Sequence, residues 1–555
     1  MIETFVFIAF VVIEIVIDFR ITSDCLVILT DDVLAEGTKR ATLNGYRYCA
    51  YTGIPYATPP VGSNRFELPK KIPFWRGRKR FIEDANICVQ MSYETFQVIG
   101  NEDCLYLNIF TLKSRQTEKN NENTDNLMPV LFFIHGGSFN IGSSNSNLNM
   151  PDYILEKEIV IVTINYRLGP FGFLSFDNVT RNVGLHDQRM ALEWIYENIL
   201  YFGGNKNGIT LSGWSSGAAS VSYHMYANKS KDLFDKAILM SGNMLNPWAF
   251  ESDVDKCSCE LLSKLNIKNS PFAIDELKAF DAYDLIPPIF TDELKIDFFG
   301  SEQFCFVPTL DNDFVPQPPH VNIRHQNPSN VPLLIGTTSL ESDWVMSFEF
   351  TNDKYPNKNP NISSDLNKVM ARYFDKHYDS IEMDRFIRNF QHASDMSYGI
   401  YQFIQQYVDS TKQGNIFVYR FAFDGQFSDL KDYAGAVHGD ELEFLFKKNS
   451  VEVNRNNINM EQILEQRMIS MWSNFIQFGN PTPNDRADDF LFHITWPPFS
   501  IDKRLLLNID YDMTVERLSD NDGAFKFWDC IYQCMYYFEC DELNEYLLYS
   551  KTIEF

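Results

Sequence analysis

Short, almost uninterrupted apolar runs recur along the chain and predict the strands of a buried sheet. The clearest are residues 129–134 (PVLFFI), 159–165 (IVIVTIN), 209–212 (ITLS), 236–240 (KAILM), 331–335 (VPLLI) and 415–421 (NIFVYRF). They do not alternate between apolar and polar residues, so both faces of the sheet are expected to be covered. Helix-like stretches lie between them, for example those that begin at Asp187 and at Ser216. This order predicts an α/β fold with a mostly parallel central sheet and helices on both faces.

No repeat and no long linker divides the 555 residues. The most linker-like segment, 113–128 (KSRQTEKNNENTDNLM), has a strand-like segment on each side and is expected to be a polar loop between neighbouring strands. We therefore predict one domain over residues 25–545, followed by a tail at 546–555.

An apolar stretch from Phe5 to Ile13 is too short to span a membrane and lies where a secretory signal is found. It lacks a preceding Lys or Arg, which leaves an ordinary buried segment or a signal anchor as alternatives. We predict that residues 1–24 are a signal peptide. The protein is then expected to be secreted or to reside in the secretory-pathway lumen, without stable membrane insertion once the signal is removed.

The formal net charge of −26 disfavours binding to nucleic acid, because phosphate backbones are repelled. Three glycosylation sequons, at Asn178, Asn228 and Asn361, agree with a secreted glycoprotein.

Ten cysteines indicate disulfides in an oxidising compartment. Zinc is the alternative, but the pairs Cys257/Cys259 and Cys530/Cys534 are not joined to a second pair at finger-like spacing, and no HExxH motif occurs. No metal or other cofactor is predicted.

Residues 213–217 (GWSSG) follow a strand-like segment and precede a helix-like one. A serine on such a sharp turn has strained backbone angles, and the turn brings the residues two before and two after it close together. Gly213 and Gly217 tolerate that crowding, and Ala218 and Ala219 keep the helix start slim. Ser215 is therefore predicted to be a nucleophile rather than a structural serine.

A serine nucleophile requires a base, which requires an orienting acid, in the chain order Ser, acid, His. His438 lies in a glycine-bearing loop (YAGAVHGDEL) after a predicted strand and is the favoured base. His377 and His392 lie in polar, helix-like stretches, and His493 in an apolar run that predicts a packed strand residue.

For the acid, the segment VPLLIGTTSLESDWV offers both Glu341 and Asp343 after a strand. Backbone N–H donors for an oxyanion are expected from the glycine-rich loop that follows another strand, at Gly136 and Gly137, and from Ser216 directly after the nucleophile.

Taken together, the chain resembles the type-B carboxylesterase/lipase family, which has an α/β-hydrolase fold and includes the cholinesterases. The motifs that carry the resemblance are YTGIPYATPPVGSNRF (51–66), EDCLYLNIF (102–110), HGGSF (135–139), NYRLGPFGFL (165–174), NVGLHDQRMALEW (182–194), GWSSGAASV (213–221), AILMSGNMLNPWA (237–249), GTTSLESDW (336–344), GAVHGDEL (435–442) and WPPF (496–499).

The resemblance implies a catalytic triad of Ser215, Glu341 and His438, because the family's Glu falls five residues after the glycine that matches Gly336. It also implies oxyanion donors from Gly137, Ser138 and Ser216. A disulfide between Cys88 and Cys104 is implied as well, and it closes a short loop beside the active-site gorge.

Three departures from the family stand out. Ser138 replaces the third glycine of the HGGG loop, and Trp214 replaces the usual Glu or His before the nucleophile. The loop between Cys88 and Cys104 has no tryptophan to stack on a quaternary ammonium, which disfavours choline esters.

The predicted function is hydrolysis of small-molecule carboxylic esters through an acyl-enzyme. The alternatives are a catalytically silent adhesion or scaffold protein and a lipase. The sequence predicts neither a particular ester nor an oligomeric state.

Overall fold

The computed structural model describes residues 25–30, 32–92, 94–112, 127–146, 151–176, 179–286, 306–341, 396–411, 415–425, 435–446, 460–484, 490–491, 493–518 and 528–530. The predicted signal peptide (1–24), the predicted tail (546–555) and most of the linker-like segment (113–126) lie outside these ranges.

A central sheet runs through the described part of the molecule, and its 11 strands follow the order β16-β15-β14-β13-β12-β11-β9-β10-β8-β4-β3. The strands are β3 (Thr38–Ala41), β4 (Arg47–Pro55), β8 (Tyr106–Thr111), β9 (Met128–Ile134), β10 (Val160–Ile164), β11 (Gly204–Trp214), β12 (Lys236–Met240), β13 (Leu333–Thr338), β14 (Ile416–Phe421), β15 (Leu505–Ile509) and β16 (Thr514–Arg517). The strands from β10 to β15 in this order pair in parallel, whereas the pairs outside them are antiparallel. The predicted mostly parallel sheet is confirmed, and all six apolar runs lie in its parallel part.

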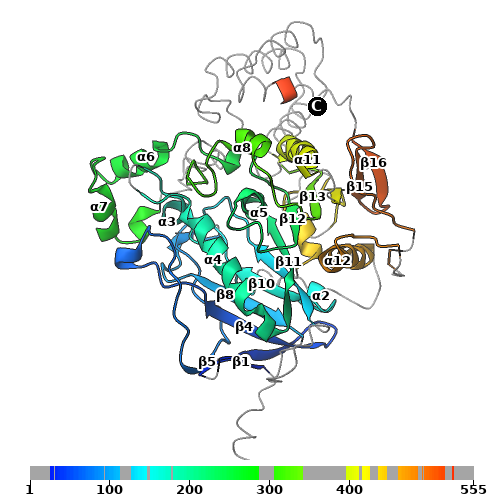
Figure 1. Ribbon diagram of the computed structural model, residues 1–555, viewed down its shortest axis with the longest axis horizontal. Coiled ribbons are helices and arrows are strands. Elements are labelled where there is room, and N and C mark those ends of the chain that lie inside the picture. The colour runs from blue at the N-terminus through cyan, green and yellow to red at the C-terminus, as the bar shows by residue number, and fades with distance from the viewer. Residues whose placement is uncertain are drawn as a thin grey trace, which may run out of the picture.

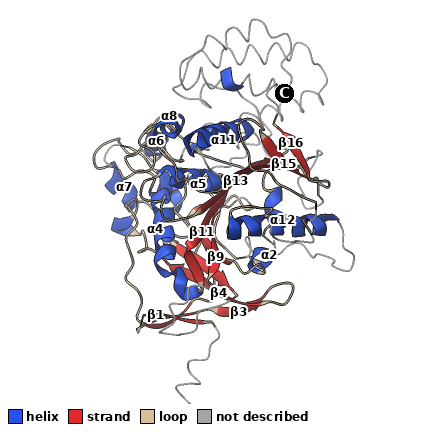
Figure 2. Cartoon of the chain, turned by 45° about the vertical axis from the view of Figure 1, so that its right-hand side comes forward, coloured by secondary structure: helices blue, strands red, loops and turns tan. Residues whose placement is uncertain are grey.

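Both faces of the sheet are covered, as the unbroken apolar runs predict. Along β9, Val130, Phe132 and Ile134 point into one hydrophobic cluster. The residues between them, Leu131 and Phe133, point into a second one on the opposite face. Helices α4 (Val183–Asn198) and α5 (Ser216–Tyr226) cover the first face, and α12 (Met460–Phe478) covers the second (Figures 1 and 2). A strand with alternating polar residues would place polar side chains against one of these apolar clusters, and the stabilisation from apolar burial on that face would be lost.

The remaining elements lie around this core. The short strands are β1 (Leu26–Thr30), β2 (Val33–Glu36), β5 (Gly77–Arg80), β6 (Gln90–Met91) and β7 (Val98–Ile99). The other α-helices are α2 (Asp152–Leu155), α3 (Gly169–Phe173), α6 (Lys256–Lys264), α7 (Ala273–Ala279), α8 (Pro319–His325) and α11 (Tyr398–Thr411). The 3₁₀-helices are η1 (Gly62–Asn64), η2 (Ile199–Phe202), η3 (Pro247–Ala249), η4 (Tyr283–Leu285) and η6 (Asp440–Phe444).

Two predictions from the sequence pattern differ from the structure. The helix predicted from Asp187 begins four residues earlier, at Val183, because Asn182 takes a left-handed conformation and starts it there. The strands on either side of the linker-like segment, β8 and β9, do not pair with each other, since β10 lies between them.

The strand order brings several loops together at one edge of the sheet. The loop after β9, the turn after β11 and the loops after β13 and β14 all leave the carboxyl ends of parallel strands. In sheets of this type, ligand sites form at that edge. Within the described ranges, no helix combines the length and the apolarity needed to cross a bilayer.

Candidate active site

Ser215 lies on the sharp turn between β11 and α5. Its backbone angles are φ 56° and ψ −123°, a strained conformation for a residue with a side chain. The turn is held by a hydrogen bond from the Ser215 N–H to the carbonyl of Met240, at 2.8 Å. A Cβ on Gly213 would lie 2.3 Å from the carbonyl carbon and oxygen of Gly217, which is closer than such atoms approach. The crowding predicted for this turn is therefore present, and glycine at position 213 relieves it.

Glu341 and His438 come together from the loops after β13 and β14. The Nδ1 atom of His438 lies 2.5 Å from Oε2 of Glu341, and the two side chains are 3% and 0% exposed. A backbone hydrogen bond from Leu340 to Ala436, at 2.8 Å, ties the two loops together beside them.

The carboxylate of Glu341 is fixed at its second oxygen as well. The Thr338 N–H donates to Oε1 at 2.7 Å. Burial opposes ionisation of this group, but the neighbouring His438 and these hydrogen bonds outweigh it and hold the pKa of Glu341 below its ordinary value. An ionised acid with both oxygens engaged can orient an imidazole.

The loop that carries His438 also contacts the turn that carries Ser215. The imidazole of His438 lies against the indole of Trp214, the residue before Ser215, with 4.7 Å between ring centroids. The loops that carry Glu341 and His438 thus meet the turn that carries Ser215 at one edge of the sheet.

The glycine-rich loop after β9 lies directly beside Ser215. A Cβ on Gly136 would be 2.9 Å from the Cβ of Ser215. Gly137 and Ser138 both have positive φ, 114° and 54°, which turns the backbone at this point. In the described part of the chain, the backbone N–H groups of Gly137, Ser138 and Ser216 donate to no protein acceptor. Such unpaired donors beside a nucleophile can bind a negatively charged oxygen.

His135 precedes this loop and supports it. Its Nδ1 bonds the Gly136 carbonyl at 2.8 Å, and its ring stacks on Tyr166 with 4.6 Å between centroids. Burial lowers the pKa of His135 to about 4, so the ring is neutral near pH 7 and packs rather than transfers protons.

Sequence reasoning missed two polar residues, Ser241 and Glu441, close to Glu341 and His438. The hydroxyl of Ser241, just after β12, donates to Oε1 of Glu441 at 2.8 Å, and Glu441 is fully buried. Burial and the charge of Glu341 raise the pKa of Glu441 to about 8, which favours the neutral form of this acid. Its position three residues after His438, in the segment HGDELEFLF, is the signal that could have revealed it.

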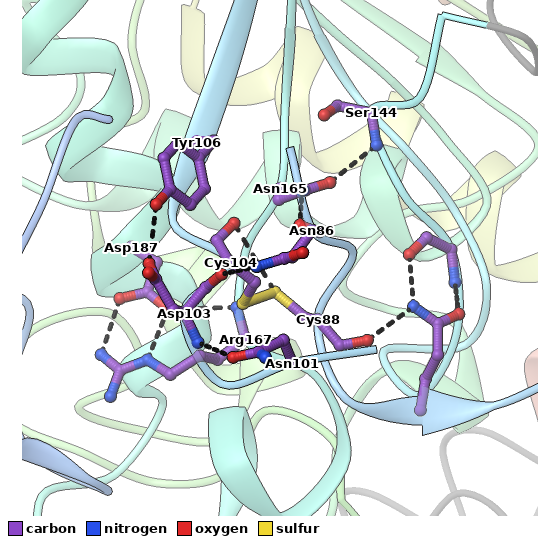
Figure 3. Close-up of a disulfide and its surroundings, with 12 residues drawn as sticks. Asn86, Cys88, Asn101, Asp103, Cys104, Tyr106, Ser144, Asn165, Arg167 and Asp187 are labelled. Carbon is purple, nitrogen blue, oxygen red and sulfur yellow. Dashed lines mark hydrogen bonds and ion pairs between the residues drawn. A yellow bond between two sulfur atoms is a disulfide. The ribbon is translucent and has the colours of Figure 1, made fainter. Parts of the chain in front are cut away.

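The expected disulfide between Cys88 and Cys104 is present (Figure 3). The side chain of Gln90 connects its loop to the glycine-rich loop, since it donates to the carbonyls of Cys88 and Gly142 and accepts from the Gly142 N–H. A second disulfide joins Cys25 and Cys49. The disulfide loop therefore supports the glycine-rich loop through the side chain of Gln90.

Of the other candidate residues predicted from the sequence, one histidine lies in the described part of the chain. His493 lies exposed in a turn with φ 73°, so its prediction as a packed strand residue is wrong. The apolar run around it does not form a strand that reaches this position. His377, His392 and Asp343 lie outside the described residues. Among the residues that are described, no three His, Cys, Asp or Glu side chains are grouped so that they could hold a metal ion.

Comparison with known proteins identifies the family. A model of the carboxylesterase family matches residues 26–528. The juvenile hormone esterase of Tribolium castaneum is 29% identical over 514 residues, which cover 81% of this chain and 83% of that protein. The bile salt-activated lipase of Bos taurus is 26% identical, over 92% of this chain and 88% of the lipase. An acetylcholinesterase of Danio rerio is 29% identical, over 86% and 84%. The chain therefore belongs to the carboxylesterase family and is a carboxylic ester hydrolase with an α/β-hydrolase fold.

Proposed function

We propose that Ser215, His438 and Glu341 form the catalytic triad of this esterase. The observation that carries the proposal is the 2.5 Å contact between His438 and Glu341, on loops that meet the strained serine turn. In this assignment, Glu341 fixes the tautomer of His438 with the proton on Nδ1 and leaves Nε2 to accept a proton from Ser215.

The reaction then follows two steps. The Oγ of Ser215 attacks the ester carbonyl while His438 takes its proton, and the same proton passes to the departing alcohol. Water, deprotonated by His438, next attacks the acyl-serine. The bond between the acyl carbon and Oγ breaks, His438 returns the proton to Oγ of Ser215, and the carboxylic acid is released. Through both steps, Glu341 stays ionised and stabilises the imidazolium.

The unpaired N–H groups of Gly137, Ser138 and Ser216 are proposed to bind the oxyanion of each tetrahedral intermediate. Their preorganised geometry stabilises the charge that develops in the transition state without reorganisation. Ser138 can fill the role of a glycine because it adopts a positive φ, at 54°.

The proposed substrates are small carboxylic esters without a choline group. The missing tryptophan in the Cys88–Cys104 loop argues against choline esters, although an acetylcholinesterase is among the relatives. A lipase-like preference for longer acyl chains stays an alternative that the bile salt-activated lipase keeps open. The intact dyad contact favours hydrolysis over a silent scaffold role.

Location in the secretory pathway is part of the proposal. The disulfides Cys25–Cys49 and Cys88–Cys104 support an oxidising compartment. Of the predicted glycosylation sites, Asn228 is exposed and available for modification, whereas Asn178 and Asn361 lie outside the described residues.

Fluorophosphonate labelling tests the triad. Wild-type protein should incorporate one label per chain, and Ser215→Ala none. Ser216→Ala, which changes the neighbouring buried serine but keeps its backbone N–H, is the matched control and should label like the wild type. Equal labelling of wild type and Ser215→Ala would show that Ser215 is not the nucleophile.

A further inference from the structure

The indole of Trp214 covers one face of the imidazole of His438. The ring centroids are 4.7 Å apart and the ring planes are inclined by 33°. Trp214 ends β11 and directly precedes Ser215, so one stretch of backbone places both the nucleophile and this ring. The imidazole is thus held by Glu341 at Nδ1 and by the indole at its face.

Two glycines leave the space that the indole fills. A Cβ on Gly136 would lie 2.6 Å from Cε3 of Trp214, and one on Gly439 would lie 2.9 Å from Cζ2. Real Cβ atoms do not approach other atoms so closely. Gly136 belongs to the glycine-rich loop after β9, and Gly439 belongs to the loop that carries His438. The indole therefore lies between these two loops.

The indole is held by packing rather than by its polar atom. Its Nε1 is buried and finds no hydrogen-bond partner among the described residues. The ring packs against the hydrophobic cluster that α12 covers. What Trp214 presents to His438 is therefore an aromatic face, which attracts a cation placed within about 6 Å of the ring centroid.

We propose that Trp214 is a positioning residue for ester hydrolysis. Its aromatic face stabilises the imidazolium that forms when His438 takes the proton of Ser215, and its bulk keeps the imidazole oriented on Glu341. The inference rests on the triad proposed above. Because this interaction strengthens only as the positive charge forms, it acts on kcat and leaves KM almost unchanged.

The test compares three variants by kcat per competent site, with competent sites counted by fluorophosphonate titration. Trp214→Phe keeps an aromatic face and should stay within about threefold of the wild-type kcat. Trp214→Leu removes the face and should lower kcat about tenfold, with KM within about twofold. Trp194→Leu is the control, since Trp194 is a buried tryptophan on α4 that contacts Phe202 and lies outside the site. It should reduce thermal stability but leave kcat per titrated site unchanged.

A purely structural role would reduce the fraction of titratable sites and leave the kcat of each site intact. If Trp214→Leu has the wild-type kcat per titrated site, the inference is wrong. Trp214→Met serves for the same comparison if the leucine variant does not fold. A wild-type protein that takes up no label would instead overturn the triad, and this inference with it.

Discussion

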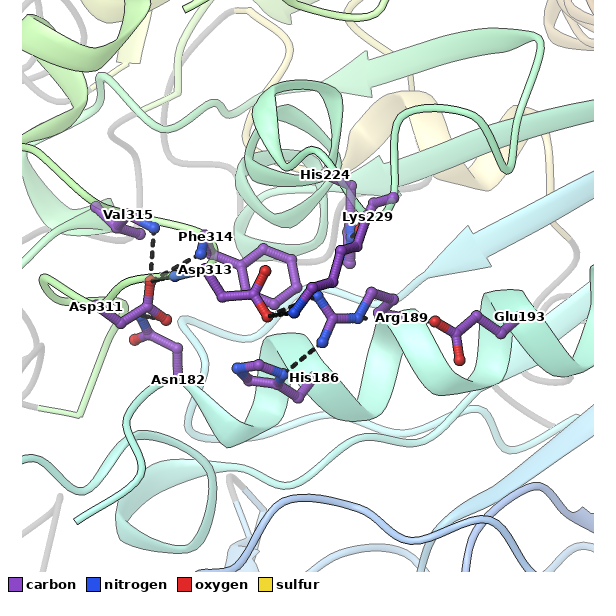
Figure 4. Close-up of polar contacts among 11 residues, drawn as sticks. Asn182, His186, Arg189, Glu193, His224, Lys229, Asp311, Asp313, Phe314 and Val315 are labelled. Carbon is purple, nitrogen blue, oxygen red and sulfur yellow. Dashed lines mark hydrogen bonds and ion pairs between the residues drawn. The ribbon is translucent and has the colours of Figure 1, made fainter. Parts of the chain in front are cut away.

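Histidines are buried in two regions of this molecule, and their neighbours differ. At the carboxyl edge of the sheet, Nδ1 of His438 faces the carboxylate of Glu341. Along α4 and α5, His186 instead accepts a hydrogen bond from the guanidinium of Arg189 at 2.8 Å (Figure 4). His224 lies close by, between Ser230 and Gln188, and bonds to both through its two ring nitrogens.

The second region holds its histidines neutral. Burial and Arg189 lower the pKa of His186 to about 4. Burial, Arg189 and His186 lower the pKa of His224 to about 3. Arg189 in turn pairs with Asp313 at 3.0 Å, and this carboxylate only partly offsets the lowering of the pKa of His186. The comparison shows that burial beside a guanidinium keeps an imidazole neutral, whereas His438 has an ionised carboxylate at its ring.

The largest expected effect is on activity, when one histidine of each region is replaced. His438→Gln should lower kcat/KM by about 10⁴-fold or more, because the base is lost. His224→Gln should stay within about threefold of the wild type, although it removes an equally buried ring. Initial rates of nitrophenyl ester hydrolysis, per mole of folded protein, measure both. Similar losses in the two variants would mean that the second region contributes to catalysis.

The next effect is on acid stability. The folded-state pKa values of His186 and His224 lie below the ordinary 6.5, so the unfolded chain binds more protons as the pH falls. The stability that these neutral rings contribute is complete above pH 6.5 and is lost as the pH falls through about 4 for His186 and about 3 for His224. Each ring should reduce the free energy of unfolding by about 1.4 kcal/mol per pH unit across its window.

Urea unfolding at a series of pH values measures this slope. The double variant His186→Gln/His224→Gln should lose stability less steeply than the wild type between pH 6 and pH 4. Identical slopes would assign the acid sensitivity to other groups and remove the distinction between the two regions.

The smallest effect is expected from Glu441→Gln, which asks whether a carboxyl group near His438 matters when it is uncharged. Since burial and Glu341 raise the pKa of Glu441 to about 8, glutamine resembles its state at pH 7, and kcat/KM should stay within about threefold of the wild type. The stability contributed by the neutral acid is complete below pH 4.5 and is lost as the pH rises through about 8. Thermal unfolding should therefore show that the melting temperature of the wild type falls relative to that of the variant as the pH rises from 5 to about 8. A large loss of activity at pH 7 would mean that Glu441 acts as an ion.

Features that depend on neighbouring residues could be predicted from the sequence. The apolar runs predicted the parallel strands because strands covered on both faces need unbroken apolar sequence. The turn at Ser215 was predictable because its strain and crowding arise within five residues. Gly213 and Gly217 have no Cβ atoms and so avoid the clashes that other residues would make there. The family motifs supplied the choice of Glu341 over Asp343, which local pattern alone left open.

Which strand ends lie beside one another depends on how the whole chain folds. Ser241 and Glu441 are 200 positions apart, and Trp214 and His438 come from different strands, so no local pattern encodes these contacts. The same reason explains why two other features were not predicted, namely the position of β10 between β8 and β9 and the exposed turn at His493. Strand order and burial follow from packing of the whole chain, since each apolar segment can pair with several others and only the complete core selects among them.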